Sequence, residues 1–107
     1  MNAEEFVANW KIEKEALLRS FMDETDNSLI AARINSMALN IEQKNQLQLV
    51  LDAVLTDTMY KLLLGLDGSA NIGNNQHTFK IYDESRNLVS DCGEIEAEAW
   101  RQFYQGT

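Results

Sequence analysis

The stretch that decides the fold is residues 62–82, LLLGLDGSANIGNNQHTFKIY. It begins with the end of an apolar helical pattern and continues into a loop rich in Gly, Asn, Asp and Ser. Gly65 or Gly68 can end the helix, because glycine accepts left-handed backbone without a side-chain penalty. Residues 78–82 then alternate between polar and apolar side chains, which indicates a half-buried strand. We therefore expect the chain to change from helix to strand here.

Two helical patterns stand near the start of the chain. The first covers residues 3–22 and has a wide apolar stripe, with Lys11, Glu13, Lys14 and Glu15 mostly on the opposite face. The second is shorter and is preceded by Thr25 and Asp26, either of which can cap it. Its side chains expected to face inward are Leu29, Ile30, Ile34 and Met37.

The third and longest helical pattern precedes the glycine-rich loop. Asn40 is a suitable N-cap, and Gln43 stands in the reach-back position of a capping box. The helix is apolar on most of its sides. One stripe consists of Leu47, Leu51, Val54, Leu55, Thr58 and Leu62. The apolar surface is extended round the helix by Leu49, Val50, Ala53, Tyr60 and Leu64. Such a helix is usually the one on which the others pack.

The last third of the chain is predicted to form a β-hairpin and a final helix. If Tyr82 pairs with Asn87 across the turn, Ile81 lies opposite Leu88 on the inward face. Ser90 or Asp91 would cap the final helix, whose inward stripe is Ile95, Ala99 and Phe103. The predicted fold class is therefore α+β. It is a mostly helical single domain over residues 1–107, with three N-terminal helices gathered on the central one, then a β-hairpin and a C-terminal helix.

Composition limits the classes of function. The chain has 107 residues, a net charge of −8 and one cysteine, Cys92. Its size fits one domain, and the single cysteine fits a reducing compartment. The start of the chain lacks the basic and apolar pattern of a signal peptide, and charges interrupt the most apolar window. We therefore expect a soluble cytoplasmic protein without membrane contact. The acidic balance disfavours direct nucleic-acid binding and favours basic protein partners.

The glycine-rich loop does not match known templates for phosphate or calcium. No Gly-Lys-Ser/Thr sequence follows its glycines, and the loop follows a helix rather than preceding one. Counted from Asp67 as an EF-hand loop, Ile72 stands where glycine is needed and Thr78 stands where glutamate is needed. Neither template is complete, so we predict no cofactor and no metal for this loop.

One alternative interpretation is a small-ligand or metal site, or a minor enzyme. Its residues would be Asp57, Asp67, His77 and Cys92, since the hairpin register would bring His77 close to Cys92. Zinc needs three or four ligands, and the chain has no further His or Cys. No nucleophile is accompanied by a recognisable base, so we expect no catalytic residues.

The leading hypothesis is a non-enzymatic module that binds a basic protein through its hairpin and loop. The candidate partner-binding residues are Asp67, Asn71, Asn74, Asn75, Asp83, Glu84, Asp91 and Glu94. In size, charge and lack of catalytic motifs the chain is similar to small acidic bacterial immunity proteins and antitoxins. This analogy concerns the type of protein and is carried by no motif. A homodimer formed through the hairpin edge is compatible with the hypothesis.

Overall fold

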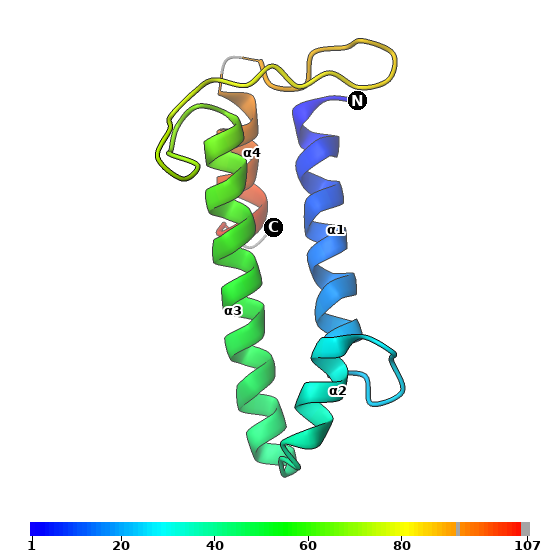
Figure 1. Ribbon diagram of the computed structural model, residues 1–107. Helices are drawn as coiled ribbons and strands as arrows, with labels where there is room; N and C mark the ends of the chain where they lie inside the picture. Colours follow the sequence, from blue (N-terminus) through cyan, green and yellow to red (C-terminus); the bar gives the residue numbers. More distant parts are fainter. Residues whose placement is uncertain (92, 106–107) are drawn as a thin grey trace.

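The computed structural model describes residues 1–91 and 93–105. Figure 1 shows their four helices: α1 (Ala3–Met22), α2 (Leu29–Ser36), α3 (Ile41–Leu66) and α4 (Glu94–Phe103). The bounds of α1, the Asn40–Gln43 capping box of α3 and Gly68 as the left-handed residue after α3 confirm the sequence predictions.

The start of α2 differs from the prediction. Ser28 is the N-cap, and its side chain accepts a hydrogen bond from the Ala31 N–H. Asp26 instead accepts a bond from the Ser28 N–H, which fixes the chain just before the helix. Asp23 in the same way accepts from Thr25. Asp23 and Asp26 therefore stabilise the turns of the linker before α2, residues 23–28. The N-cap position of α2 is left to Ser28.

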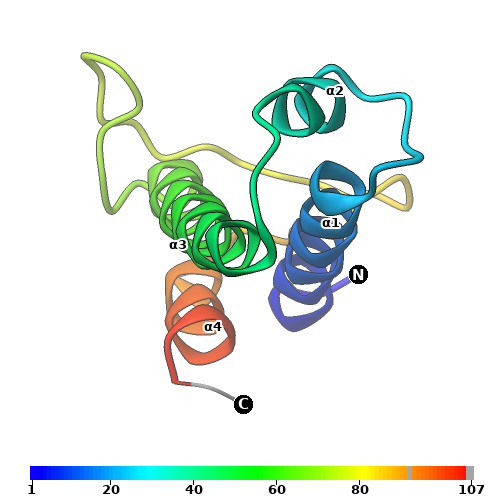
Figure 2. The same cartoon turned by 90° about the horizontal axis from the view of Figure 1, so that it is seen from below.

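The helices form an elongated molecule about 47 Å long and 28 Å across. In Figure 1, α1 and α3 run in opposite directions, and α2 connects them at the foot. Figure 2 shows that α4 lies beside both α1 and α3 on one side of the pair. The connection between α3 and α4 crosses the end of the molecule where α1 begins and α3 ends.

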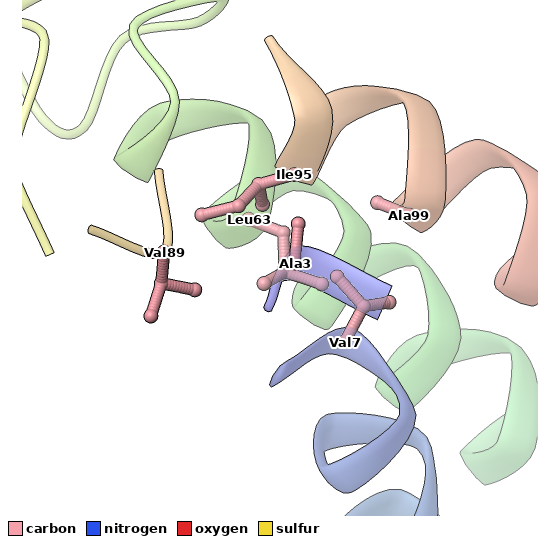
Figure 3. Packing of buried hydrophobic residues seen from close by; sticks show 6 residues of the cluster. All are labelled: Ala3, Val7, Leu63, Val89, Ile95 and Ala99. Atoms are coloured by element: carbon pink, nitrogen blue, oxygen red, sulfur yellow. The ribbon is translucent and has the colours of Figure 1, made fainter. Parts of the chain in front are cut away.

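The hydrophobic core lies at that same end. Figure 3 shows side chains from α1, α3, α4 and the connection between α3 and α4 meeting there: Ala3, Val7, Leu63, Val89, Ile95 and Ala99. Leu63 and Ile95 are completely buried. Ile95 and Ala99 face inward as the sequence predicted, while Val89 supplies a contact from the long connection. The core therefore joins α1, α3 and α4 and also holds the end of the connection.

The predicted β-hairpin is wrong. Among the described residues the structure contains no sheet, only two isolated bridges, Ile72 with Asn75 and Tyr82 with Leu88. The fold class is accordingly helical rather than α+β. The expected homodimer through a hairpin edge loses its structural basis, because the edge on which it depended is not formed by these residues.

A serine side chain explains why the strands do not pair. The Ser90 hydroxyl accepts from the Ile81 N–H and donates to the Phe79 carbonyl, so it replaces ladder bonds that a second strand would make. The chain does return, since the Val89 N–H donates to the Ile81 carbonyl. Leu88, however, lies opposite Tyr82 instead of Ile81. This shift of one residue buries Val89 and leaves Leu88 exposed.

Several apolar side chains predicted to be inward are exposed. On α2 these are Leu29, Ile30 and Met37, whereas Ile34 is buried as predicted. On α3 they are Leu49, Val50, Val54 and Leu62. The helix is apolar on most sides, but its neighbours cover only part of it. None of the helices in the described part of the chain is both long and apolar enough to cross a membrane.

Candidate functional site

The candidate site is residues 67–91, called here the loop segment, together with the first turn of α4. The connection from α3 to α4 is far longer than the roughly 12–15 residues that compact domains usually allow without regular structure. Loops of this length that keep a defined path commonly carry binding functions. Some side chains of the segment form the contacts that fix this path. The side chains outside those contacts are the ones that can bind a partner.

The first anchor of the loop segment is Asp67, directly after α3. Its carboxylate is buried and accepts a hydrogen bond of 2.9 Å from the Glu96 N–H. The Ser69 hydroxyl donates to the Glu96 carboxylate at 2.6 Å. The N-cap of α4 is Gly93, with φ of 77°, and it has no side chain to cap the helix. Asp67 therefore performs the capping that the sequence assigned to Ser90 or Asp91.

The second anchor is the end of the loop segment. Val89 and Ser90 are buried, and the Ser90 hydroxyl bonds link this part of the chain to residues 79–81. Because the segment is attached at both ends to the core, its middle is displayed on a rigid support. This is the usual arrangement of a binding loop on a scaffold.

Asp83 holds the turn of the loop segment. Its carboxylate accepts from the N-terminal ammonium group at 2.6 Å and from the Ser85 and Asn87 N–H groups at 2.9 Å each. The N-terminal ammonium group and the Asn87 N–H keep the pKa of Asp83 well below its ordinary value of 3.8. Asp83 and Asp67, both predicted as partner-binding residues, are therefore occupied in holding the fold.

The middle of the loop segment is fully displayed. Every residue from 71 to 80 is exposed, including Asn71, Asn74, Asn75 and His77. A tight turn shapes this part, with hydrogen bonds in both directions between the backbones of Ile72 and Asn75. The three asparagines predicted to contact a partner thus lie together on a protruding, backbone-fixed turn.

Three predicted acidic residues have exposed side chains. They are Glu84 in the turn, Asp91 at the end of the loop segment and Glu94 at the start of α4. Within the described residues none of these three carboxylates forms an ion pair, whereas nearby Glu98 is paired with Arg101. Glu94 also stands in the first turn of α4, where a negative charge favours the helix dipole. These carboxylates are available to a cationic ligand.

The structure does not bring the described residues of the alternative site together into a cluster. Asp57 lies on α3, where it is 3.4 Å from the Tyr104 hydroxyl and 3.3 Å from the Lys61 ammonium. Asp67 is ten residues further along, roughly 15 Å in helical rise. His77 is in the exposed middle of the loop segment, and Cys92 lies outside the described residues. No group of three potential metal ligands occurs within residues 1–91 and 93–105.

One polar feature was not predicted by the sequence. A groove lined by α1, α3 and the end of α4 has a volume of about 620 Å³, and Lys14 is one of its lining residues. Lys14 is buried, and its ammonium lies 2.7 Å from the Asp52 carboxylate and 3.1 Å from the Thr56 hydroxyl. We expected Lys14 on the solvent face. The signal that could have revealed it is Asp52, an acid within an apolar helix that needs a nearby cation.

No protein-family model, no curated protein and no solved structure matches this chain.

Proposed function

We propose that this protein is a non-catalytic interaction module that binds a basic partner protein through the loop segment and the first turn of α4. The observation that carries the proposal is a long exposed loop, anchored at both ends, together with three exposed carboxylates that form no ion pair with the other described residues. Glu84, Asp91 and Glu94 supply the charge, and Asn71, Asn74 and Asn75 supply amide groups for hydrogen bonds.

The shape of the loop segment supports binding of a folded protein. Its displayed turn stands out to the side of the end of α3, as Figure 1 shows in yellow-green. Association costs less free energy when the binding loop is already ordered. The bonds made by Asp67, Asp83 and Ser90 provide this order without using the asparagines or the three exposed acids.

The charge of the protein supports a basic partner in particular. With a net charge of −8, the protein attracts a cationic surface and increases the rate of encounter at low ionic strength. A role of this kind, in which an acidic protein covers a basic surface, is the one performed by immunity proteins and antitoxins. We place it in the cytoplasm, where a single cysteine remains reduced.

Charge-matched variants test the proposal. The double variant Glu84→Gln, Glu94→Gln removes two exposed carboxylates from the proposed site. The control Glu13→Gln, Glu15→Gln removes two from α1 and changes the net charge by the same amount. Each tagged protein is used to recover partners from cells of its source, and the recovered proteins are quantified by mass spectrometry at low and at moderate salt.

We expect the unmodified protein and the α1 control to recover the same basic protein. The loop variant should recover about tenfold less of it, since two charge contacts of about 0.5–1 kcal/mol each correspond to that ratio. Added salt should weaken the association. Equal recovery by the two variants would refute the proposed site. Recovery of no basic protein by any of them would refute the function.

A further inference from the structure

A second groove of the molecule lies outside the site already described and is mostly apolar. Its volume is about 480 Å³, which is in the range of pockets that hold small molecules. It is called here the α1 groove, and its lining residues are Met1, Phe6, Asn9, Trp10, Glu13 and Met59. None of these residues belongs to the loop segment or to α4, so the α1 groove is separate from the proposed partner site.

Two aromatic rings form a wall of the α1 groove. Phe6 and Trp10 lie one turn apart on α1, with their ring centroids 6.0 Å apart and their planes at 55° to each other. Both side chains are half-buried, because they also pack against the hydrophobic core. The core therefore fixes the two tilted rings in position, and a ligand does not have to order them when it binds.

Two methionines complete the apolar lining. Met59 lies on α3, one turn before the completely buried Leu63, and Met1 lies at the start of the chain. Thioether side chains are flexible and polarisable, so they adapt to the shape of a ligand. The ammonium group of Met1 is bound to Asp83 at 2.6 Å, and its positive charge is therefore already paired.

The rim of the α1 groove carries one carboxylate, that of Glu13. Glu13 and Asn9 are exposed and stand one turn apart on α1. No side-chain hydrogen bond or ion pair joins either of them to another described residue. A carboxylate and the face of an aromatic ring attract the same kind of ligand, since both favour a positive charge. The α1 groove thus combines an apolar lining with a preference for cations.

We propose that the α1 groove binds a small organic cation of the quaternary ammonium class. The apolar part of the ligand lies against Phe6 and Met59, and its cationic nitrogen faces Trp10 and Glu13. A primary ammonium group has three N–H donors to satisfy, whereas the lining offers few side-chain acceptors, the carboxylate of Glu13 and the amide oxygen of Asn9. A quaternary nitrogen has no donors and leaves none unsatisfied on entering an apolar groove.

The requirement for few N–H donors also favours a free small molecule over a side chain of the basic partner. Lysine and arginine carry several donors each, and they find more acceptors among the three exposed carboxylates and the asparagines of the loop segment. The α1 groove and the partner site share no residue. Binding at one can therefore be absent while binding at the other is present.

The first test is a titration of the full chain with benzyltrimethylammonium, followed by calorimetry and by the fluorescence of Trp10. The other tryptophan, Trp100, is replaced by phenylalanine in the fluorescence experiment. Benzyl alcohol and phenylacetate are the neutral and the anionic probes. We expect the cation to bind at least about tenfold more tightly than benzyl alcohol, and phenylacetate to bind most weakly. Equal affinity for the three probes, or no saturable binding of the cation up to about 10 mM, would overturn the proposal.

Glu13→Gln removes the carboxylate and keeps the shape of the side chain. It should weaken binding of benzyltrimethylammonium by about threefold to fivefold and leave binding of benzyl alcohol unchanged. Glu84→Gln is the matched control, because it removes the same charge from the loop segment. It should leave the affinity for the cation unchanged. Equal weakening by the two substitutions would show that only the net charge attracts the cation, and the assigned site would be wrong.

Trp10→Leu removes the aromatic ring but keeps the wall apolar, and calorimetry follows binding. It should weaken binding of the cation by about fivefold or more and that of benzyl alcohol much less. Because Trp10 also packs on the core, circular dichroism checks the helix content, and Trp10→Phe provides a milder variant that should keep part of the preference for the cation. Equal losses for the cation and for benzyl alcohol would refute the role of the ring.

The last test separates a small molecule from a side chain of a protein. N-acetyl-lysine methylamide presents a lysine side chain with its neighbouring amides, and it should bind at least about tenfold more weakly than benzyltrimethylammonium. Binding of the two probes with similar affinity would show that the α1 groove accepts cationic side chains of a protein. The assignment of a small organic cation would then be wrong.

Discussion

The two halves of α3 belong to one continuous helix but have different environments. In the second half, Leu63 and Gly65 are buried against α1, α4 and the loop segment. In the first half, Leu49 and Val50 are more than half exposed. Apolar periodicity shows where a helix can be covered, whereas the number and length of its neighbours determine where it is covered. Since α4 ends at Phe103, it reaches only the second half of α3.

The largest effect is expected from truncating core side chains in the second half. Leu63→Ala should lower the free energy of unfolding by about 2–5 kcal/mol, because Leu63 is completely buried and leaves a cavity. Leu49→Ala should change it by less than about 0.5 kcal/mol, because Leu49 is 65% exposed. Urea denaturation measures both. Similar losses for the two variants would break the contrast between the halves.

An intermediate effect is expected at the upper end of α3, where Asp67 caps α4. Asp67→Ala removes the acceptor of the Glu96 N–H and should cost about 1–2 kcal/mol. Asp91→Ala is the control, because its side chain is exposed and forms no cap bond with the described residues of α4. Thermal unfolding compares the two. If Asp91→Ala lowers the melting temperature more than Asp67→Ala does, Asp91 is the cap of α4, as the sequence pattern predicted. The hydrogen bond between Asp67 and α4 would then be wrong.

The smallest effect concerns pH. Asp83 has a lowered pKa in the folded protein, so its contribution to stability is present above its ordinary value of 3.8 and is lost as pH falls below it. Asp83→Asn should therefore be less stable than the unmodified protein near pH 7, and the difference should shrink at pH values well below 3.8. Melting temperatures from pH 7 to pH 2 test this. A difference that does not change with pH would show that Asp83 is not bonded as described.

Sequence patterns predicted the parts of the fold that local interactions determine. The capping box of Asn40 and Gln43, the bounds of α1 and the inward face of α4 depend on residues within one or two turns. The β-hairpin was wrong because the side chain of Ser90 takes the backbone bonds of residues 79–81. The position of Ser90 depends on its neighbour Val89, which is buried in a core formed by helices. No local sequence pattern predicts that burial.

The predicted partner-binding residues have two kinds of environment in the structure. The middle of the loop segment is exposed, and Glu84, Asp91 and Glu94 face solvent, whereas their role in binding stays a prediction. Asp67 and Asp83 have structural roles because their acceptors meet donors distant in the chain, the Glu96 N–H and the N-terminal ammonium group. Lys14 was missed for the same reason, since Asp52 reaches it from another helix.

Amide hydrogen exchange along α3 is the most direct test of the contrast between its halves. In a dilute sample, amides in the first half should exchange much faster than those around Leu63, because few neighbours cover the first half. Equal protection of both halves in the dilute sample would contradict the account.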